Sequence, residues 1–110
     1  MKAHMFFIFL FQKEYKDDVI LALTSSGIEE SVMMEGKNVS KVLSGDMPLF
    51  SGFFMDKRMK SDSAYVYTGA FSDMEQIEEA LDTLRDSVDD EDLEEILRVI
   101  ILPVENIVVK

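Results

Sequence analysis

The 110-residue chain contains no cysteine and a single histidine, and these two shortages exclude several kinds of site. Without thiols there is no disulfide, no zinc–thiolate centre and no cysteine nucleophile. As a catalytic base, His4 would need an orienting partner and a nucleophile, whereas in a strand it needs only a hydrogen bond near the sheet edge. We therefore expect His4 to be structural, predict that the protein is not an enzyme, and name no catalytic residue.

The common motifs for binding phosphate or calcium are missing as well. The sequence has neither G-x-x-x-x-G-K-[ST] nor G-x-G-x-x-G, so it lacks the phosphate cradle of the standard nucleotide folds. The acidic run at residues 89–95 lacks the D-x-D-x-D-G order and the glycine turn of an EF-hand, and a solvated helix start explains it more simply. We expect no metal site and no required cofactor.

Long hydrophobic runs are also absent. The apolar segment at residues 5–11 is far too short to span a bilayer. No small-residue cleavage site follows it, because the chain continues into Gln12, Lys13 and Glu14. We predict a cytoplasmic protein without membrane insertion.

Positive charge is scarce, because 11 Lys and Arg residues stand against 22 Asp and Glu residues and the formal net charge is −11. A field of this sign repels nucleic acid, so we expect no nucleic-acid partner. Residues 36–63 differ from the rest, since five basic and three acidic residues give 5 − 3 = +2 and leave −11 − 2 = −13 on the remaining chain. This middle segment could receive an anion.

The chain does contain enough apolar sequence, 47% of its residues, for one packed domain at residues 1–110. Gly27 is expected to end the first helix, and Pro103 to interrupt a strand. The expected strands are residues 3–11, 28–35, 64–71, 99–102 and 107–109, and the expected helices are residues 13–25 and a helix that begins with a Ser72/Glu75 capping box. This order, βαββαβ plus a short C-terminal strand, predicts an α+β, ferredoxin-like split β-α-β fold with one antiparallel sheet and two helices on one face.

Two of the expected strands are apolar on both faces. In residues 3–11 one alternating set is Met5, Phe7, Phe9 and Phe11, and the other is Phe6, Ile8 and Leu10; residues 64–71 show the same property. A strand in a two-layer fold needs only one apolar face. Because two helices can cover one face only, we expect another copy of the chain to cover the second.

Residues 36–63 form a longer connection than compact domains usually contain. The segment includes the large apolar side chains Leu49, Phe50, Phe53, Phe54 and Met55. One interpretation is a folded excursion that packs on its own domain or on a neighbour; the other is a mobile arm that touches a ligand or a target. We predict that Lys57, Arg58 and Lys60 at its polar tip contact an acidic partner surface.

Two stretches resemble divergent PII-like signalling proteins of the nitrogen regulatory protein P-II superfamily. One is Asp46-Met47-Pro48-Leu49-Phe50, preceded by Lys41-Val42-Leu43, and the other is the ending that contains Leu102-Pro103-Val104-Glu105. With the order of elements, the similarity covers nearly the whole chain. The resemblance implies a homotrimer with sheets inward and helices outward, effector sites between subunits, and a loop after the second strand that contacts a target protein or transporter.

The resemblance also implies an adenine nucleotide as effector, joined by 2-oxoglutarate in many relatives, and a role in nitrogen regulation. We predict that Lys37 and Lys41 beside the second strand and Arg98 near the last strands bind the anion, brought together across a subunit boundary; the guanidinium fork of Arg98 suits a phosphate or carboxylate. For Arg98 a surface ion pair with Glu94 or Glu95 remains open. Two alternative functions also remain open, a CutA-like trimer that handles divalent ions and a small enzyme on the same fold.

Overall fold

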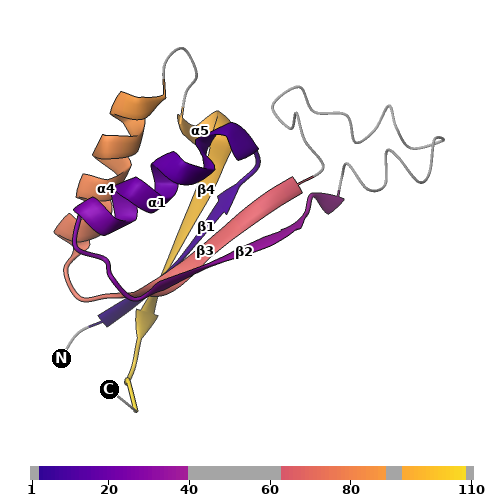
Figure 1. Ribbon diagram of the computed structural model, residues 1–110. Coiled ribbons are helices and arrows are strands. Elements are labelled where there is room, and N and C mark those ends of the chain that lie inside the picture. The colour runs from indigo at the N-terminus through magenta and orange to yellow at the C-terminus, as the bar shows by residue number, and fades with distance from the viewer. Residues whose placement is uncertain (1–2, 40–62, 89–92, 109–110) are drawn as a thin grey trace.

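The computed structural model describes residues 3–39, 63–88 and 93–108, and it contains one antiparallel sheet with helices on one side (Figure 1). The strands are β1 (Ala3–Leu10), β2 (Ser31–Lys37), β3 (Ser63–Phe71) and β4 (Leu97–Val104). The helical elements are η1 (Lys13–Tyr15), α1 (Lys16–Ser25), α4 (Met74–Ser87) and α5 (Leu93–Ile96). The predicted α+β class with an antiparallel sheet is confirmed.

The strand order is β2-β3-β1-β4, and every neighbouring pair is antiparallel. β1 lies between β3 and β4, so that Phe7 is opposite Thr68 on one side and Ile100 on the other. β2 and β4 are the two edge strands. Helices α1 and α4 lie side by side over the same face of the sheet (Figure 1). None of the helices in the described ranges is both long and apolar enough to cross a lipid bilayer.

The turn after α1 begins at Gly27, which has a positive φ of 86°. Its N–H donates to the carbonyl of Thr24 (3.2 Å), and the N–H of Ile28 donates to the carbonyl of Leu23 (3.0 Å). These two bonds form a Schellman motif, which a glycine at this position favours. The predicted end of the helix at Gly27 is confirmed, but the next strand starts at Ser31 and not at residue 28, because Ile28 closes the helix and is buried.

The capping box of α4 lies one residue later than the sequence predicts. The carboxylate of Asp73 accepts a hydrogen bond from the N–H of Glu75 (3.0 Å), and the side-chain oxygen of Gln76 accepts one from the N–H of Asp73 (3.3 Å). Asp73 is the last residue with extended backbone angles before the helix. The Ser72/Glu75 prediction is therefore wrong, and Asp73 and Gln76 satisfy the amides at the helix start.

β4 is longer than predicted and continues through Pro103. Pro103 is opposite His4 in the β1–β4 ladder, and the strand ends at Val104. β4 is an edge strand of the described sheet, so none of the described strands pairs with its outer side, and a residue without an N–H is tolerated there. The predicted interruption at Pro103 is wrong. The predicted short strand at residues 107–109 is not formed by residues 107–108, and residue 109 lies outside the described ranges.

The hydrophobic core lies between the helices and one face of the sheet, which we call the covered face. The hydroxyl of Tyr67 donates to the carbonyl of Lys16 in α1 (3.0 Å) and ties the two layers together. Burial, with smaller contributions from Tyr65 and Asp17, raises the pKa of Tyr67 well above its ordinary value. The buried core side chains include Phe6, Ile8, Leu10, Val19, Ala22, Leu23, Tyr65, Tyr67, Phe71, Ile77, Ala80, Leu84, Leu93, Ile96 and Leu97.

Only the ends of the predicted long loop belong to the described residues. Gly36 and Lys37 complete β2, and Ser63 begins β3. The apolar side chains expected to anchor the loop and the basic tip at Lys57, Arg58 and Lys60 lie outside the described residues. Both interpretations of this segment therefore stay predictions.

Candidate interface and anion-binding residues

The second face of the sheet, which we call the open face, is apolar and lies opposite the helices. Alternation along the strands and the ladder registers place one set of side chains there. The set is Met5, Phe7 and Phe9 of β1, Ala64, Val66, Thr68 and Ala70 of β3, Val32, Met34 and Gly36 of β2, and Arg98, Ile100 and Leu102 of β4. Arg98, at the β4 edge, is the one charged residue in this set. The structure thus assigns the two apolar sets of β1: Phe6, Ile8 and Leu10 face the helices, and Met5, Phe7 and Phe9 do not.

The open face is most exposed along its two edges. Val32 and Met34 are 60% and 49% exposed on β2, and Ile100 and Leu102 are 47% and 45% exposed on β4. Between them Phe7 and Phe9 are half-buried, with their rings stacked at a centroid distance of 6.4 Å. An apolar surface that is continuous over four strands is uncommon on a monomer and typical of a contact surface.

Arg98 occupies the start of β4, opposite Phe9. Its Nη1 donates to the carbonyl oxygens of Glu94 and Leu97, so this side chain caps the end of α5. Within the described ranges Arg98 forms no ion pair with Glu94 or Glu95, and its Nε and Nη2 donate to no described residue. Two nitrogens of the guanidinium group, with three N–H donors between them, are therefore left for a ligand.

Lys37 is the last residue of β2, and the structure does not bring it next to Arg98. β2 ends and β4 starts at the same end of the sheet, but the two strands are its opposite edges. Three strand spacings separate them, or about 14 Å. The third predicted ligand residue, Lys41, lies outside the described residues. Lys37 and Arg98 of one chain thus form no common site by themselves.

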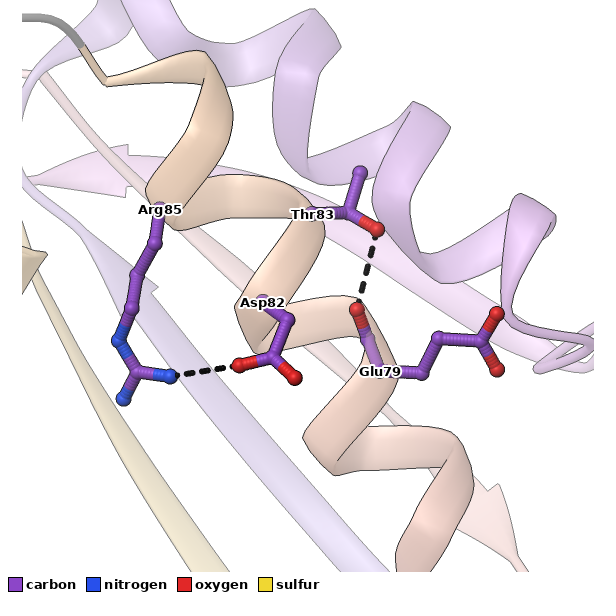
Figure 2. A network of polar contacts seen from close by, with 4 residues as sticks. All are labelled: Glu79, Asp82, Thr83 and Arg85. Carbon is purple, nitrogen blue, oxygen red and sulfur yellow. Dashed lines mark hydrogen bonds and ion pairs between the residues drawn. The ribbon is translucent and has the colours of Figure 1, made fainter.

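A groove of about 210 Å³ lies beside Arg98, between α4, α5 and β4. It is lined by Leu81 and Arg85 of α4, Leu93 and Glu94 of α5, and Leu97, Arg98 and Val99 of β4. Nη1 of Arg85 pairs with Oδ1 of Asp82 at 3.0 Å, and both side chains are largely exposed (Figure 2). Arg85 is not among the residues predicted from the sequence. The available signal was its position four residues after Leu81, which puts both on one side of a helix.

A second hollow, of about 280 Å³, lies at the opposite end of the sheet. Its lining includes Glu29 and Glu30 from the turn before β2 and Ser72 and Gln76 from the start of α4, and it includes no basic residue. An anion would meet two carboxylates there. Of the two hollows, the Arg85–Arg98 groove is the one suited to a negatively charged group.

His4 belongs to β1, which lies between β3 and β4, and it lines neither hollow. Its ring stacks on that of Phe71 at a centroid distance of 5.3 Å, and its partner in β4 is Pro103. Among the residues that the structure describes, no three His, Asp or Glu side chains are grouped so that they could hold a metal ion. The chemistry that the described surface offers is apolar contact on the open face and guanidinium donation beside β4.

No known protein-family model matches this sequence, and no curated protein matches it at a significant level.

Proposed function

We propose that the chain is a PII-like regulatory protein that assembles as a homotrimer and binds a small anion between its subunits. The observation that carries the proposal is the open face, an apolar surface across all four strands that no described element covers. Exposing such a surface costs about 25 cal/mol for each Å² that a partner could bury. Three copies with their open faces turned inward would remove this area from water.

The chain topology supports a ferredoxin-like assignment. A helix lies between β1 and β2 and another between β3 and β4, and β3 pairs beside β1 in an all-antiparallel sheet. This is the connectivity expected for the split β-α-β arrangement. Homo-oligomers of such domains can use the sheet face without disturbing the helix layer.

The positions of the two described basic residues also support the proposal. Lys37 and Arg98 lie at one end of the sheet but on opposite edges. In a closed head-to-tail ring, the β2 edge of one copy meets the β4 edge of the next. Such a ring brings Lys37 of one copy toward Arg98 of its neighbour. An anion such as the phosphate of an adenine nucleotide would then find two cations that one chain cannot provide.

In this proposal, binding of the ligand is transmitted to a target protein through residues 36–63, which begin at the Lys37 end of β2. Lys57, Arg58 and Lys60 would contact an acidic surface of a target protein or transporter. Ordering of the segment by the ligand would couple the two events. The protein would act as a cytoplasmic signal-transduction component of nitrogen regulation and need no catalytic residue.

Light scattering at micromolar concentration tests the assembly. We expect the mass of a trimer, and a monomer would overturn the proposal. A thermal-shift screen with ATP, ADP, AMP, 2-oxoglutarate and divalent ions tests the ligand, since a ligand of the folded state raises the melting temperature. We expect a nucleotide to raise it in the wild type and not in Lys37→Gln or Arg98→Gln, while Lys13→Gln serves as the charge-matched control. A shift with divalent ions alone would favour the CutA-like alternative.

A further inference from the structure

The groove between α4, α5 and β4 is lined by two arginine residues of a strongly acidic protein. Arg85 lies in the last turn of α4 and Arg98 at the start of β4, and both line the groove. The groove belongs to a single chain. It therefore differs from the Lys37–Arg98 site of the proposed function, which needs two copies.

The remaining lining of the groove is aliphatic. Leu81, Leu93, Leu97 and Val99 line it together with the charged residues, and none of the described residues in the lining is aromatic. An aromatic base would thus have no ring to stack on. At about 210 Å³ the groove is also smaller than the pockets that hold drug-sized ligands, which are roughly 300–1,000 Å³. The occupant should be small and carry an aliphatic part.

The charge of the lining argues against a polyanion. Arg85 and Arg98 contribute +2 and Glu94 contributes −1, and Asp82 already pairs with Arg85. The local balance is close to neutral, while the whole chain carries −11. A ligand with several negative charges would find too few positive charges in this groove to balance its own. A ligand with one carboxylate and one ammonium group carries no net charge and matches the near-neutral lining.

We propose that this groove binds a free aliphatic α-amino acid of the leucine type. The α-carboxylate takes the guanidinium donors of Arg98 and Arg85, which suit a carboxylate fork. The α-ammonium pairs with the carboxylate of Glu94, and the side chain of the ligand lies on Leu81, Leu93, Leu97 and Val99. The site extends the proposed regulatory function through the shared Arg98, but it requires only one chain.

Titration of the ¹⁵N-labelled protein, followed by amide NMR shifts, tests the site with three matched probes. L-Leucine carries both charged groups, 4-methyl-2-oxopentanoate lacks the ammonium, and 3-methylbutylamine lacks the carboxylate. We expect saturable shifts in residues 81–88 and 93–99 with leucine, and dissociation constants roughly tenfold weaker or more for the other two. Equal affinity of leucine and the oxo acid, or no shifts with leucine, would overturn the proposal.

Variants separate this site from the site between subunits. Arg85→Gln should weaken leucine binding about tenfold or more, because a charged hydrogen bond is lost, while Lys13→Gln removes one positive charge outside the groove and should leave it unchanged. Lys37→Gln should also leave leucine binding unchanged. Leucine should bind a monomeric Phe7→Asp protein as it binds the wild type, because the groove belongs to one chain. Failure of the trimer proposal would therefore leave this prediction unchanged. Unchanged leucine binding by Arg85→Gln would overturn the proposal that leucine binds in this groove.

Discussion

The two faces of β1 carry nearly the same chemistry but have different surroundings. Phe6, Ile8 and Leu10 are fully buried beneath the helices, whereas Phe7 and Phe9 are only half-buried on the open face. An aliphatic or aromatic side chain on the covered face stabilises the monomer. The same kind of side chain on the open face gains its full burial only when something covers it. The difference teaches that hydrophobicity alone does not distinguish core residues from interface residues. The position of the helix layer determines which face of β1 becomes the core.

The largest expected effect comes from placing a charge on each face of β1. Ile8→Asp should lower the free energy of unfolding by about 4 kcal/mol or more, because the carboxylate would be buried without a partner. Phe7→Asp should leave a folded monomer and abolish the assembly. Urea unfolding monitored by circular dichroism, combined with light scattering, measures both outcomes. An Ile8→Asp protein as stable as the wild type, or a Phe7→Asp protein that is unfolded, would break the comparison.

Replacing a glycine by alanine should cost stability at Gly69 and have little effect at Gly36. A Cβ at Gly69, on the covered-face side of β3, would lie 2.5 Å from the carbonyl oxygen of Glu30, so Gly69→Ala should cost about 1–3 kcal/mol. Gly36, on the open-face side of β2, has its nearest such atom at 4.0 Å, the carbonyl oxygen of Ala64, so Gly36→Ala is the matched control with little effect. Chemical denaturation gives both values. Equal loss in the two variants would contradict the close approach of the Glu30 carbonyl to Gly69.

Removing one hydroxyl on the covered face should have a smaller effect. Tyr67→Phe loses the hydrogen bond to the carbonyl of Lys16 and should cost about 1 kcal/mol at neutral pH. Because folding raises the pKa of Tyr67, the wild type should lose stability as the pH rises above about 10, the unfolded value. Tyr67→Phe should lose less over that range. Denaturation at pH 7 and at pH 10–11 checks the sign, and parallel losses would contradict it.

The smallest effect on the monomer is expected at the edges of the open face. Met34→Lys and Ile100→Lys replace half-exposed side chains, so each should change the monomer's unfolding free energy by about 0.5 kcal/mol or less. Both should nevertheless weaken the proposed assembly, which dilution followed by light scattering would detect. If either variant assembles as the wild type does, that edge lies outside the interface.

The sequence predicts much of the fold because its strongest patterns are local. The apolar spacing of α1 and the preference of Gly27 for a positive φ depend on near neighbours, and both are confirmed. The wrong predictions have two causes: two neighbouring residues suit the same local role, or the outcome depends on the position of a strand in the sheet. Ser72 and Asp73 both suit a helix cap, and only the helix start at Met74 separates them. Pro103 is acceptable because β4 is an edge strand, which is a property of the whole sheet.

The candidate site was less predictable from sequence. Arg98 was identified through a resemblance, and the structure places it at a groove with two guanidinium nitrogens free of described partners. Arg85 was missed, because its place in the lining of the same groove as Arg98 depends on how α4, α5 and β4 are arranged and not on sequence spacing. Lys37 and Arg98 were expected to meet across a subunit boundary, and three strand spacings separate them in one chain, so that prediction stays open. Strand order decides such distances.

The central position of β1 has a consequence for how the chain folds. In its two ladders Phe7 lies opposite residues that come 68 − 7 = 61 and 100 − 7 = 93 positions later in the chain. Pairings this distant in sequence slow folding, because a long loop must close before any contact forms. During synthesis the aromatic segment around Phe7 therefore emerges before either partner strand, and until they are made neither of its ladders can form. A segment of this composition is prone to aggregation in that interval, so its nascent form should depend on chaperones more than the stability of the finished sheet would indicate.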